Sequence, residues 1–211
     1  MRSSGVVTSP PGGGNVDVVS FASLPREAAW QHRGARSGFE VVFFRDTDGG
    51  CLIQGCTTAV EDGTPWTVEY AIQVDGAGAT RSARISGRSA AGSSSTVLEA
   101  DGAGHWLVDG ENAPRLDGCL DVDLESSAMT NALPVRRLGL AVAAHAVAPA
   151  AYVRAVGLAT GRLEQTYLRT PGEAALQSYD YTAPAFDFRC RLIYDQSGLV
   201  LEYPGIAVRA A

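Results

Sequence analysis

Short runs of hydrophobic and β-branched residues recur along most of the chain, and glycine, aspartate and proline separate them. Runs of this kind, bounded by turn-forming residues, are typical of β-strands. Most connections between them are too short for a crossover helix, so neighbouring strands should pair antiparallel. We expect strands at residues 39–45, 51–60, 66–74, 81–88, 95–100, 105–109, 119–125, 151–158, 163–169, 186–194 and 199–203.

The segment at residues 126–145 does not share this pattern. Pro134 stands where the first turn of a helix tolerates proline, and Val135, Leu138 and Val142 follow it at spacings of three and four residues. A short helix fits this segment, and a strand over 135–142 fits nearly as well, so both stay open. Many strands with one candidate helix predict a mainly β fold, a large curved antiparallel sheet or incomplete barrel wrapped around a short helix.

The composition favours one domain with many turns. The chain has 211 residues, of which 24 are glycine and 10 are proline, and 45% are hydrophobic. This length suits one sizeable domain, and the glycine and proline content suits a β-rich fold. The first residues are rich in serine, glycine and proline, so we expect a disordered tail at 1–17 and a single domain at 18–211.

The charge and the cysteine content limit the classes of partner and the compartment. The formal net charge of −6 disfavours nucleic acid and anionic membrane surfaces as partners. No hydrophobic run is long enough to span a membrane, and no export signal is visible. Four cysteines in a chain of this length do not make a disulfide framework, so reduced thiols are expected. We therefore expect a cytoplasmic protein without a membrane span.

The most informative stretch is residues 115–125, in which acidic and hydrophobic residues alternate. On a strand its polar residues would share one face, and these are Asp117, Cys119, Asp121, Asp123 and Glu125. Carboxylates in such a row repel one another, and burial without partners would raise their pKa values. Three arrangements relieve this: exposure of the row to solvent, ion pairs with Arg136 and Arg137, or a bound divalent cation. The sequence leaves all three open.

Three stretches carry a resemblance to a known family: residues 101–106 (DGAGHW), 116–125 (LDGCLDVDLE) and 130–138 (TNALPVRRL). Shorter matching stretches extend the likeness from about Trp30 to the C-terminus, at 65–66, 151–153, 164–167, 179–181 and 198–205. With these motifs the chain resembles a bacterial family that is named for glycolipid binding and was long classed as a domain of unknown function. One departure is Ala132, where the family tends to have threonine.

The resemblance implies a mainly β fold, an open barrel around helical material, similar to carriers that move lipoproteins and glycolipids in cell envelopes. It also implies a non-catalytic protein that binds an amphipathic small molecule, expected to be a glycolipid, in a concave cavity of the sheet. An apolar hollow would hold acyl chains, and a polar mouth with aromatic rings and charged groups would hold the sugar. The candidate ligand-binding residues are therefore Trp106, Asp117, Asp121, Asp123, Asn131, Arg136, Arg137, Tyr167 and Tyr181.

Two other classes of function stay open. A carboxylate-dependent hydrolase or transferase acting on a glycoconjugate needs two carboxyl groups in different environments across a cleft. A protein-interaction module needs only an exposed strand edge or an apolar face. The sequence has three histidines at unrelated positions and no nucleophile elbow, phosphate-binding loop or zinc-ligand spacing. We therefore assign no catalytic residue, no metal site and no cofactor, and we leave the oligomeric state open.

Overall fold

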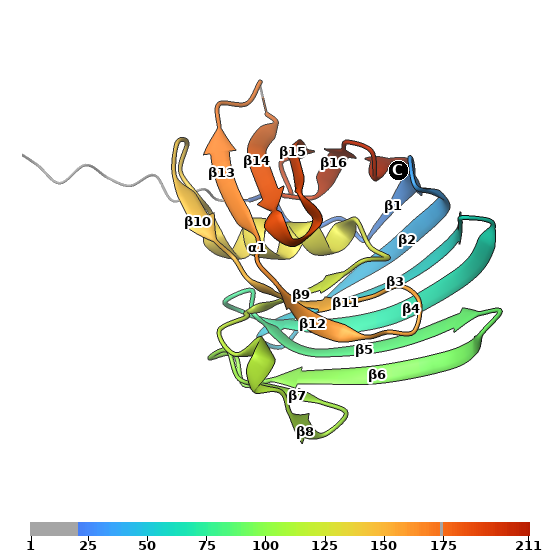
Figure 1. Ribbon diagram of the computed structural model, residues 1–211. Helices are drawn as coiled ribbons and strands as arrows, with labels where there is room; N and C mark the ends of the chain where they lie inside the picture. Colours follow the sequence, from blue (N-terminus) through green and yellow to red (C-terminus); the bar gives the residue numbers. More distant parts are fainter. Residues whose placement is uncertain (1–20, 174) are drawn as a thin grey trace, which may run out of the picture.

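The protein is built mainly from one large antiparallel sheet, described by a computed structural model for residues 21–173 and 175–211. The sheet has 14 strands. Their order is β10 (His145–Val147), β13 (Thr166–Thr170), β14 (Gln177–Ala183), β15 (Phe188–Tyr194), β16 (Val200–Tyr203), β17 (Ala207–Arg209), β1 (Glu27–His32), β2 (Arg36–Thr47), β3 (Gly50–Glu61), β4 (Thr64–Asp75), β5 (Thr80–Ser89), β6 (Gly92–Ala100), β7 (Trp106–Val108) and β8 (Glu111–Asn112). The sheet is curved (Figure 1). It is not closed, because β10 and β8 form its two edges and do not pair with each other.

A helical segment and a second, small sheet lie within the curve of the large sheet (Figure 1). The 3-10 turn η2 (Met129–Asn131) leads directly into the α-helix α1 (Ala132–Leu138). Gly139 ends this helix in the left-handed conformation, at φ 51°, which glycine adopts without steric cost. The small sheet has the order β12 (Thr160–Leu163), β11 (Ala150–Val153) and β9 (Asp121–Leu124), and its β9–β11 pair is parallel.

The predicted fold class is confirmed, and several details of the prediction are wrong. Of the two alternatives for residues 126–145, the short helix is present. The strand expected at 119–125 covers only Asp121–Leu124, because the 3-10 turn η1 (Pro114–Leu116) precedes it. The strand expected at 151–158 ends at Val153, and β1 and β14 lie where no strand was expected. The tail expected at 1–17 lies outside the described residues.

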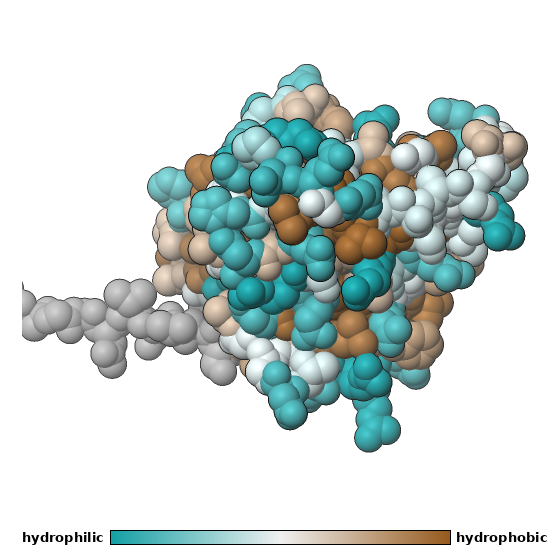
Figure 2. Space-filling model, turned by 90° about the horizontal axis from the view of Figure 1, so that it is seen from below, coloured by the Kyte–Doolittle hydropathy of each residue, from teal (hydrophilic) through white to brown (hydrophobic). Residues whose placement is uncertain are grey.

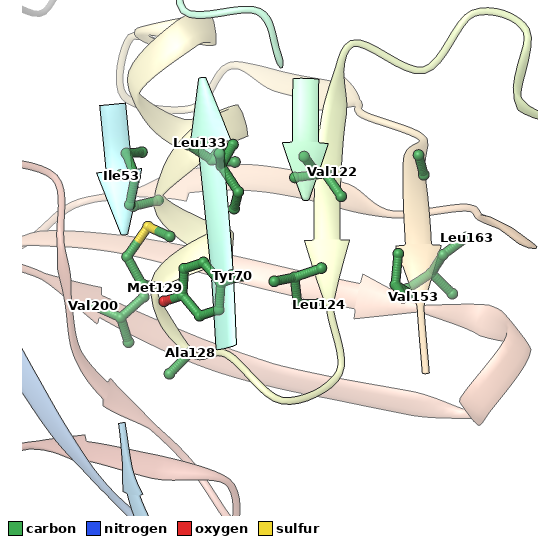
Figure 3. Close-up of a cluster of buried hydrophobic side chains, with 14 of the residues drawn as sticks. Ile53, Tyr70, Val122, Leu124, Ala128, Met129, Leu133, Val153, Leu163 and Val200 are labelled. Atoms are coloured by element: carbon green, nitrogen blue, oxygen red, sulfur yellow. The ribbon is translucent and has the colours of Figure 1, made fainter. Parts of the chain in front are cut away.

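Strand β4 illustrates how alternation builds the core. Its inward positions from Trp66 to Val74 are all buried, while the positions between them are at least partly exposed. The inward side chains meet the small sheet and the η2–α1 segment in one hydrophobic cluster, which includes Ile53, Val122 and Met129 (Figure 3). This cluster packs the helix and the small sheet against the concave face of the large sheet.

Gly55 in β3 makes room for a long polar contact across this face. A Cβ atom at Gly55 would overlap the ring of Tyr70, its direct partner in β4. Without a side chain there, the Tyr70 ring crosses β3 and its hydroxyl donates a hydrogen bond to Glu40 of β2, at 2.6 Å. A glycine in the interior of a strand is therefore required here by close approach of a neighbour.

Hydrophobic residues also reach the surface, in separate patches bordered by hydrophilic residues on the face that Figure 2 shows. On the outward face of β2, Phe39, Val41 and Phe43 are 51%, 41% and 53% exposed. Surface hydrophobic residues of this kind are common, so the interaction-module hypothesis stays a prediction. Among the described residues, no helix has the length and hydrophobicity that crossing a membrane requires.

Candidate functional site

A cavity of about 320 Å³ lies between the small sheet and the strands β14 to β16, and we call it the aromatic cavity. Five aromatic side chains line it: Tyr152, Tyr181, Phe186, Phe188 and Tyr203. Its polar lining comes from Arg36, Asp123, Glu125, Ser127 and Asn131. Aromatic rings around a small number of polar groups are typical of sites that bind small molecules.

The aromatic side of this cavity follows from strand alternation and register. Tyr181 of β14, Phe188 of β15 and Tyr203 of β16 come from neighbouring strands and lie on the same, concave face of the sheet. Their ring centroids lie 6.3 Å (Tyr181–Phe188), 6.1 Å (Tyr181–Tyr203) and 6.0 Å (Phe188–Tyr203) apart. Rings from these three strands therefore form one aromatic wall. A second pair of lining rings, Tyr152 and Phe186, have centroids 5.5 Å apart.

Asp123 is the buried carboxylate of this cavity, and only 8% of it is exposed. Its Oδ1 accepts a hydrogen bond from the Thr130 hydroxyl at 3.0 Å, and its Oδ2 accepts one from the Gln165 amide. No ion pair of the described residues includes Asp123. Burial, which disfavours the charged form, raises the pKa of Asp123 from 3.8 to about 6 in spite of these hydrogen bonds.

Tyr167 lies behind the cavity wall and supports its polar groups. It is fully buried, and its ring centroid is 5.1 Å from that of Tyr181. Its hydroxyl contacts the side-chain oxygen of Asn131 at 3.0 Å and that of Gln165 at 3.1 Å. Tyr167 therefore orients two residues that line or hold the site and does not itself line the cavity.

Glu40 forms a second buried carboxylate next to the aromatic cavity. It is fully buried, and no ion pair of residues 21–173 and 175–211 includes it. Its carboxylate accepts hydrogen bonds from the hydroxyls of Tyr70 and Ser127 and, at 2.8 Å, from the backbone N–H of Ala128. Burial raises the pKa of Glu40 above its ordinary value. Because Ser127 lines the cavity, Glu40 fixes the start of the η2–α1 segment at the cavity wall.

Asp121 and Arg137 form a buried ion pair with two hydrogen bonds. Arg137 donates from Nε to Oδ1 at 3.0 Å and from Nη2 to Oδ2 at 2.5 Å, and the side chains are 14% and 1% exposed. The ion-pair alternative is therefore correct for Asp121. A solvent-exposed row from Asp117 to Glu125 is wrong as a whole, because Asp121 and Asp123 are buried and Asp117 precedes the strand.

Arg136 and Arg137 line a second cavity, of about 290 Å³, which we call the arginine cavity. It lies on the other side of the η2–α1 segment. The hydrophobic cluster of Figure 3 separates the two cavities, since Ile53 and Met129 border the arginine cavity and Leu124 and Leu163 border the aromatic one. Of the predicted residues, Asp123, Asn131 and Tyr181 line the aromatic cavity, and Arg136 and Arg137 line the arginine cavity.

Trp106 and Asp117 lie in neither cavity. Trp106 is 2% exposed, and its indole N–H donates to the backbone oxygen of Cys119 at 2.9 Å, which is a core contact. Asp117 is exposed, and its backbone oxygen accepts a hydrogen bond from Arg162. In the described part of the chain, no three His, Cys, Asp or Glu side chains are placed to hold a metal ion.

Sequence reasoning missed Arg36, Glu40, Gln165 and Tyr203. Arg36 extends its guanidinium to the backbone oxygen of Glu125 at 2.7 Å and lies over the Trp66 ring at 5.4 Å from its centroid. Gln165 and Tyr203 were inside stretches that carried the family resemblance. A signal for Glu40 was available too, because it alternates with Val42 on the inward face of β2, where a lone carboxylate is unusual.

Comparison with known proteins places the chain in a family. The family model described as "Putative glycolipid-binding" matches residues 27–209. A DUF1089 family protein from Pseudomonas aeruginosa, known from a crystal structure, is 33% identical, with 89% of this chain and 96% of that chain covered and a TM-score of 0.68. A beta-barrel-like protein of the domain of unknown function DUF1849 from Brucella abortus is 12% identical, with coverage of 87% and 93% and a TM-score of 0.49. No protein with a curated description matches. The chain belongs to the family whose model bears the description "Putative glycolipid-binding".

Proposed function

We propose that the protein binds an amphipathic molecule with a sugar head group, and that the aromatic cavity receives the head group. The observation that carries this proposal is the combination of five aromatic rings with the buried carboxylate of Asp123 around one cavity. The description of the family supports the same class of ligand.

The chemistry of the lining suits a sugar. A sugar ring has apolar C–H faces, which pack on aromatic rings such as those of Tyr181 and Tyr203. Its hydroxyls need acceptors, and each oxygen of Asp123 accepts one hydrogen bond from the described residues, so lone pairs stay free. Ligand pockets usually measure roughly 300–1,000 Å³. A cavity of about 320 Å³ is therefore sized for a head group and not for a whole glycolipid.

Binding is favoured over catalysis by how the two cavity carboxylates are held. A glycoside hydrolase needs one carboxyl that is free to give a proton to the leaving group. Both oxygens of Asp123 accept hydrogen bonds, and Glu125 accepts one from the backbone N–H of Ala155 at 2.8 Å and lies 3.5 Å from Arg154. In these contacts both carboxyl groups serve as acceptors, whereas the raised pKa of Asp123 is the feature that would suit a general acid. The hydrolase alternative is tested by incubating the protein with nitrophenyl glycosides, and sustained release of nitrophenol that Asp123→Asn abolishes would favour it.

The test of binding uses octyl glucoside, which joins one sugar to one alkyl chain. Calorimetric titration below its micellar concentration is expected to give saturable binding with one site. Tyr181→Ala and Asp123→Asn should each weaken binding by about tenfold or more, because each removes a contact to the head group. Phe39→Ala is the matched control, since this exposed aromatic residue lies on the opposite face of the sheet.

Two comparisons decide the outcome. Octanol reproduces the alkyl chain of octyl glucoside and glucose reproduces its sugar. Both should bind more weakly than octyl glucoside. Equal loss of affinity in Phe39→Ala and Tyr181→Ala, or octanol binding as tightly as octyl glucoside, would contradict a head-group site at the aromatic cavity. Native mass spectrometry with lipid extraction of the protein from its own host then identifies the natural ligand.

A further inference from the structure

The arginine cavity combines apolar walls with a guanidinium, that of Arg136, which forms no ion pair with the described residues. Its apolar lining comes mainly from Leu24, Phe44, Ile53, Val74, Leu133 and Leu199. Phe44, Ile53 and Val74 come from the large sheet and Leu133 from α1, which lies in the curve of the sheet (Figure 1), and Leu24 and Leu199 come from the segments before β1 and β16. Apolar walls of this kind favour an alkyl chain.

Two of the charged residues that line this cavity, Arg137 and Asp75, have charged partners. Arg137 is neutralised by Asp121, as described above. The acidic residue of the lining, Asp75, accepts hydrogen bonds from the backbone N–H groups of Ala77 and Ala79 and lies 3.6 Å from Arg81. Both of these charges therefore have ionic partners, Asp121 and Arg81, which do not line the cavity.

Arg136 is the charge that lacks an anion. Within residues 21–173 and 175–211, no carboxylate lies within 4.0 Å of its guanidinium nitrogens. Nη1 donates to the backbone oxygens of Ala22 and Ser197, and the guanidinium carbon lies 5.5 Å from the centroid of the Phe21 ring. Since guanidinium has five N–H donors, Nε and Nη2 keep donors for an anion. Burial lowers the pKa of Arg136, and Asp195, which lies beyond ion-pair distance and contacts Arg209, opposes this effect only in part.

We propose that the arginine cavity binds the anionic head group of a single-chain amphiphile at Arg136, with the alkyl chain against the walls formed by β3, β4 and α1. A carboxylate or a phosphate matches the guanidinium fork, and a nearby apolar wall matches the chain. This site is independent of the sugar site, because the hydrophobic cluster separates the two cavities. On this proposal the protein binds two classes of ligand, one in each cavity.

The first experiment uses the unmodified protein and compares decanoate, decyl phosphate and decanol. These probes share one alkyl chain and differ in head group and charge. Calorimetric titration should show decanoate or decyl phosphate binding at least about tenfold more tightly than decanol, since one charge-assisted hydrogen bond is worth that much or more. Equal affinity for decanol and the two anions would overturn the proposal, whatever the variants do.

Substitutions then locate the site. Arg136→Gln should weaken decanoate binding by about tenfold or more, and Arg136→Lys should keep part of the affinity because it keeps the charge. Arg84→Gln is the matched control, an exposed arginine on β5. Tyr181→Ala, which disrupts the sugar site, should leave decanoate binding unchanged. Decanoate binding that is unaffected by Arg136→Gln, or lost in Tyr181→Ala, would overturn the proposal.

Cys51 gives a readout that needs no substitution. This buried thiol lines the arginine cavity, whereas Cys190 is a half-buried thiol outside it. Bound decanoate should slow alkylation of Cys51 and leave Cys190 unaffected, as measured for each cysteine by peptide mass spectrometry. Equal slowing at both cysteines, or none at Cys51, would contradict binding in this cavity.

Discussion

Replacing Asp123 with asparagine should increase the stability of the protein at neutral pH. Most of that gain should be absent in acid. The pKa of Asp123 is raised by burial from 3.8 to about 6. An acid whose pKa is raised on folding stabilises the native state below its unfolded pKa, and this contribution is lost as pH increases through its folded pKa. At neutral pH the native state therefore carries the cost of a charged Asp123, which asparagine does not have.

The magnitude follows from the two pKa values. Their difference, about 2.2 (6 minus 3.8), corresponds to a cost of about 3 kcal/mol at about pH 7.5. At about pH 4.5 the same relation gives a remaining cost of about 1 kcal/mol for Asp123. Asparagine has only one acceptor oxygen, so it loses the hydrogen bond from either Thr130 or Gln165, at about 1 kcal/mol. We expect Asp123→Asn to be more stable than the parent by about 2 kcal/mol at about pH 7.5 and nearly equal to it at about pH 4.5.

Urea denaturation at the two pH values measures these differences directly. Asp46→Asn is the control, because Asp46 is exposed and its replacement should change the free energy of unfolding by less than about 0.5 kcal/mol at either pH. A variant at Asp123 that is less stable than the parent by the same amount at both pH values would refute the reasoning. It would mean that the carboxylate stabilises the fold through its hydrogen bonds and carries no cost of burial.

Three further predictions concern the core and its charges. Arg137→Ala should lower the free energy of unfolding by about 3–5 kcal/mol because it leaves Asp121 buried without its partner, and the double variant Asp121→Asn with Arg137→Gln should recover part of that loss in the same urea assay. Gly55→Ala should cost about 1–3 kcal/mol because its Cβ overlaps the Tyr70 ring, and the cost should nearly vanish in a Tyr70→Ala background, which a double-mutant cycle measures. Burial lowers the pKa of His32 from 6.5 to about 4, so the parent should lose stability as pH falls through this window, by up to about 3 kcal/mol relative to His32→Phe, in urea melts across that range.

The sequence predicts the large sheet well because its information is local. In β4, every second residue from Trp66 to Val74 is hydrophobic, and the strand has one face in the core. The same rule applied to β14 would have found it, since Tyr179, Tyr181 and Ala183 alternate in the same way. This period is hard to recognise in the sequence because polar residues outnumber hydrophobic ones in the strand.

The candidate site is harder to predict because its contacts are not local. Alternation correctly puts Asp121 and Asp123 on one side of a strand, yet solvent exposure is the wrong environment for them. The group that compensates Asp121 comes from Arg137, and one of those that hold Asp123 comes from Gln165, 42 residues away. No periodicity specifies which distant side chain will meet a buried carboxylate, so the division into two cavities emerges only in three dimensions.

The energetics of residues 121–137 favour a functional role for this segment on grounds other than family membership. Three buried carboxylates lie in it or against it: Asp121, Asp123 and Glu40. Hydrophobic residues of similar size would be as stable or more stable at such positions. A domain is stable by only roughly 5–15 kcal/mol, so a cost of about 3 kcal/mol at Asp123 alone is a large fraction. Buried charges that weaken a fold concentrate where a protein must present polar groups to a ligand. We therefore infer that this segment, which forms a wall of both cavities, lowers the stability of the fold in order to present polar groups to a ligand.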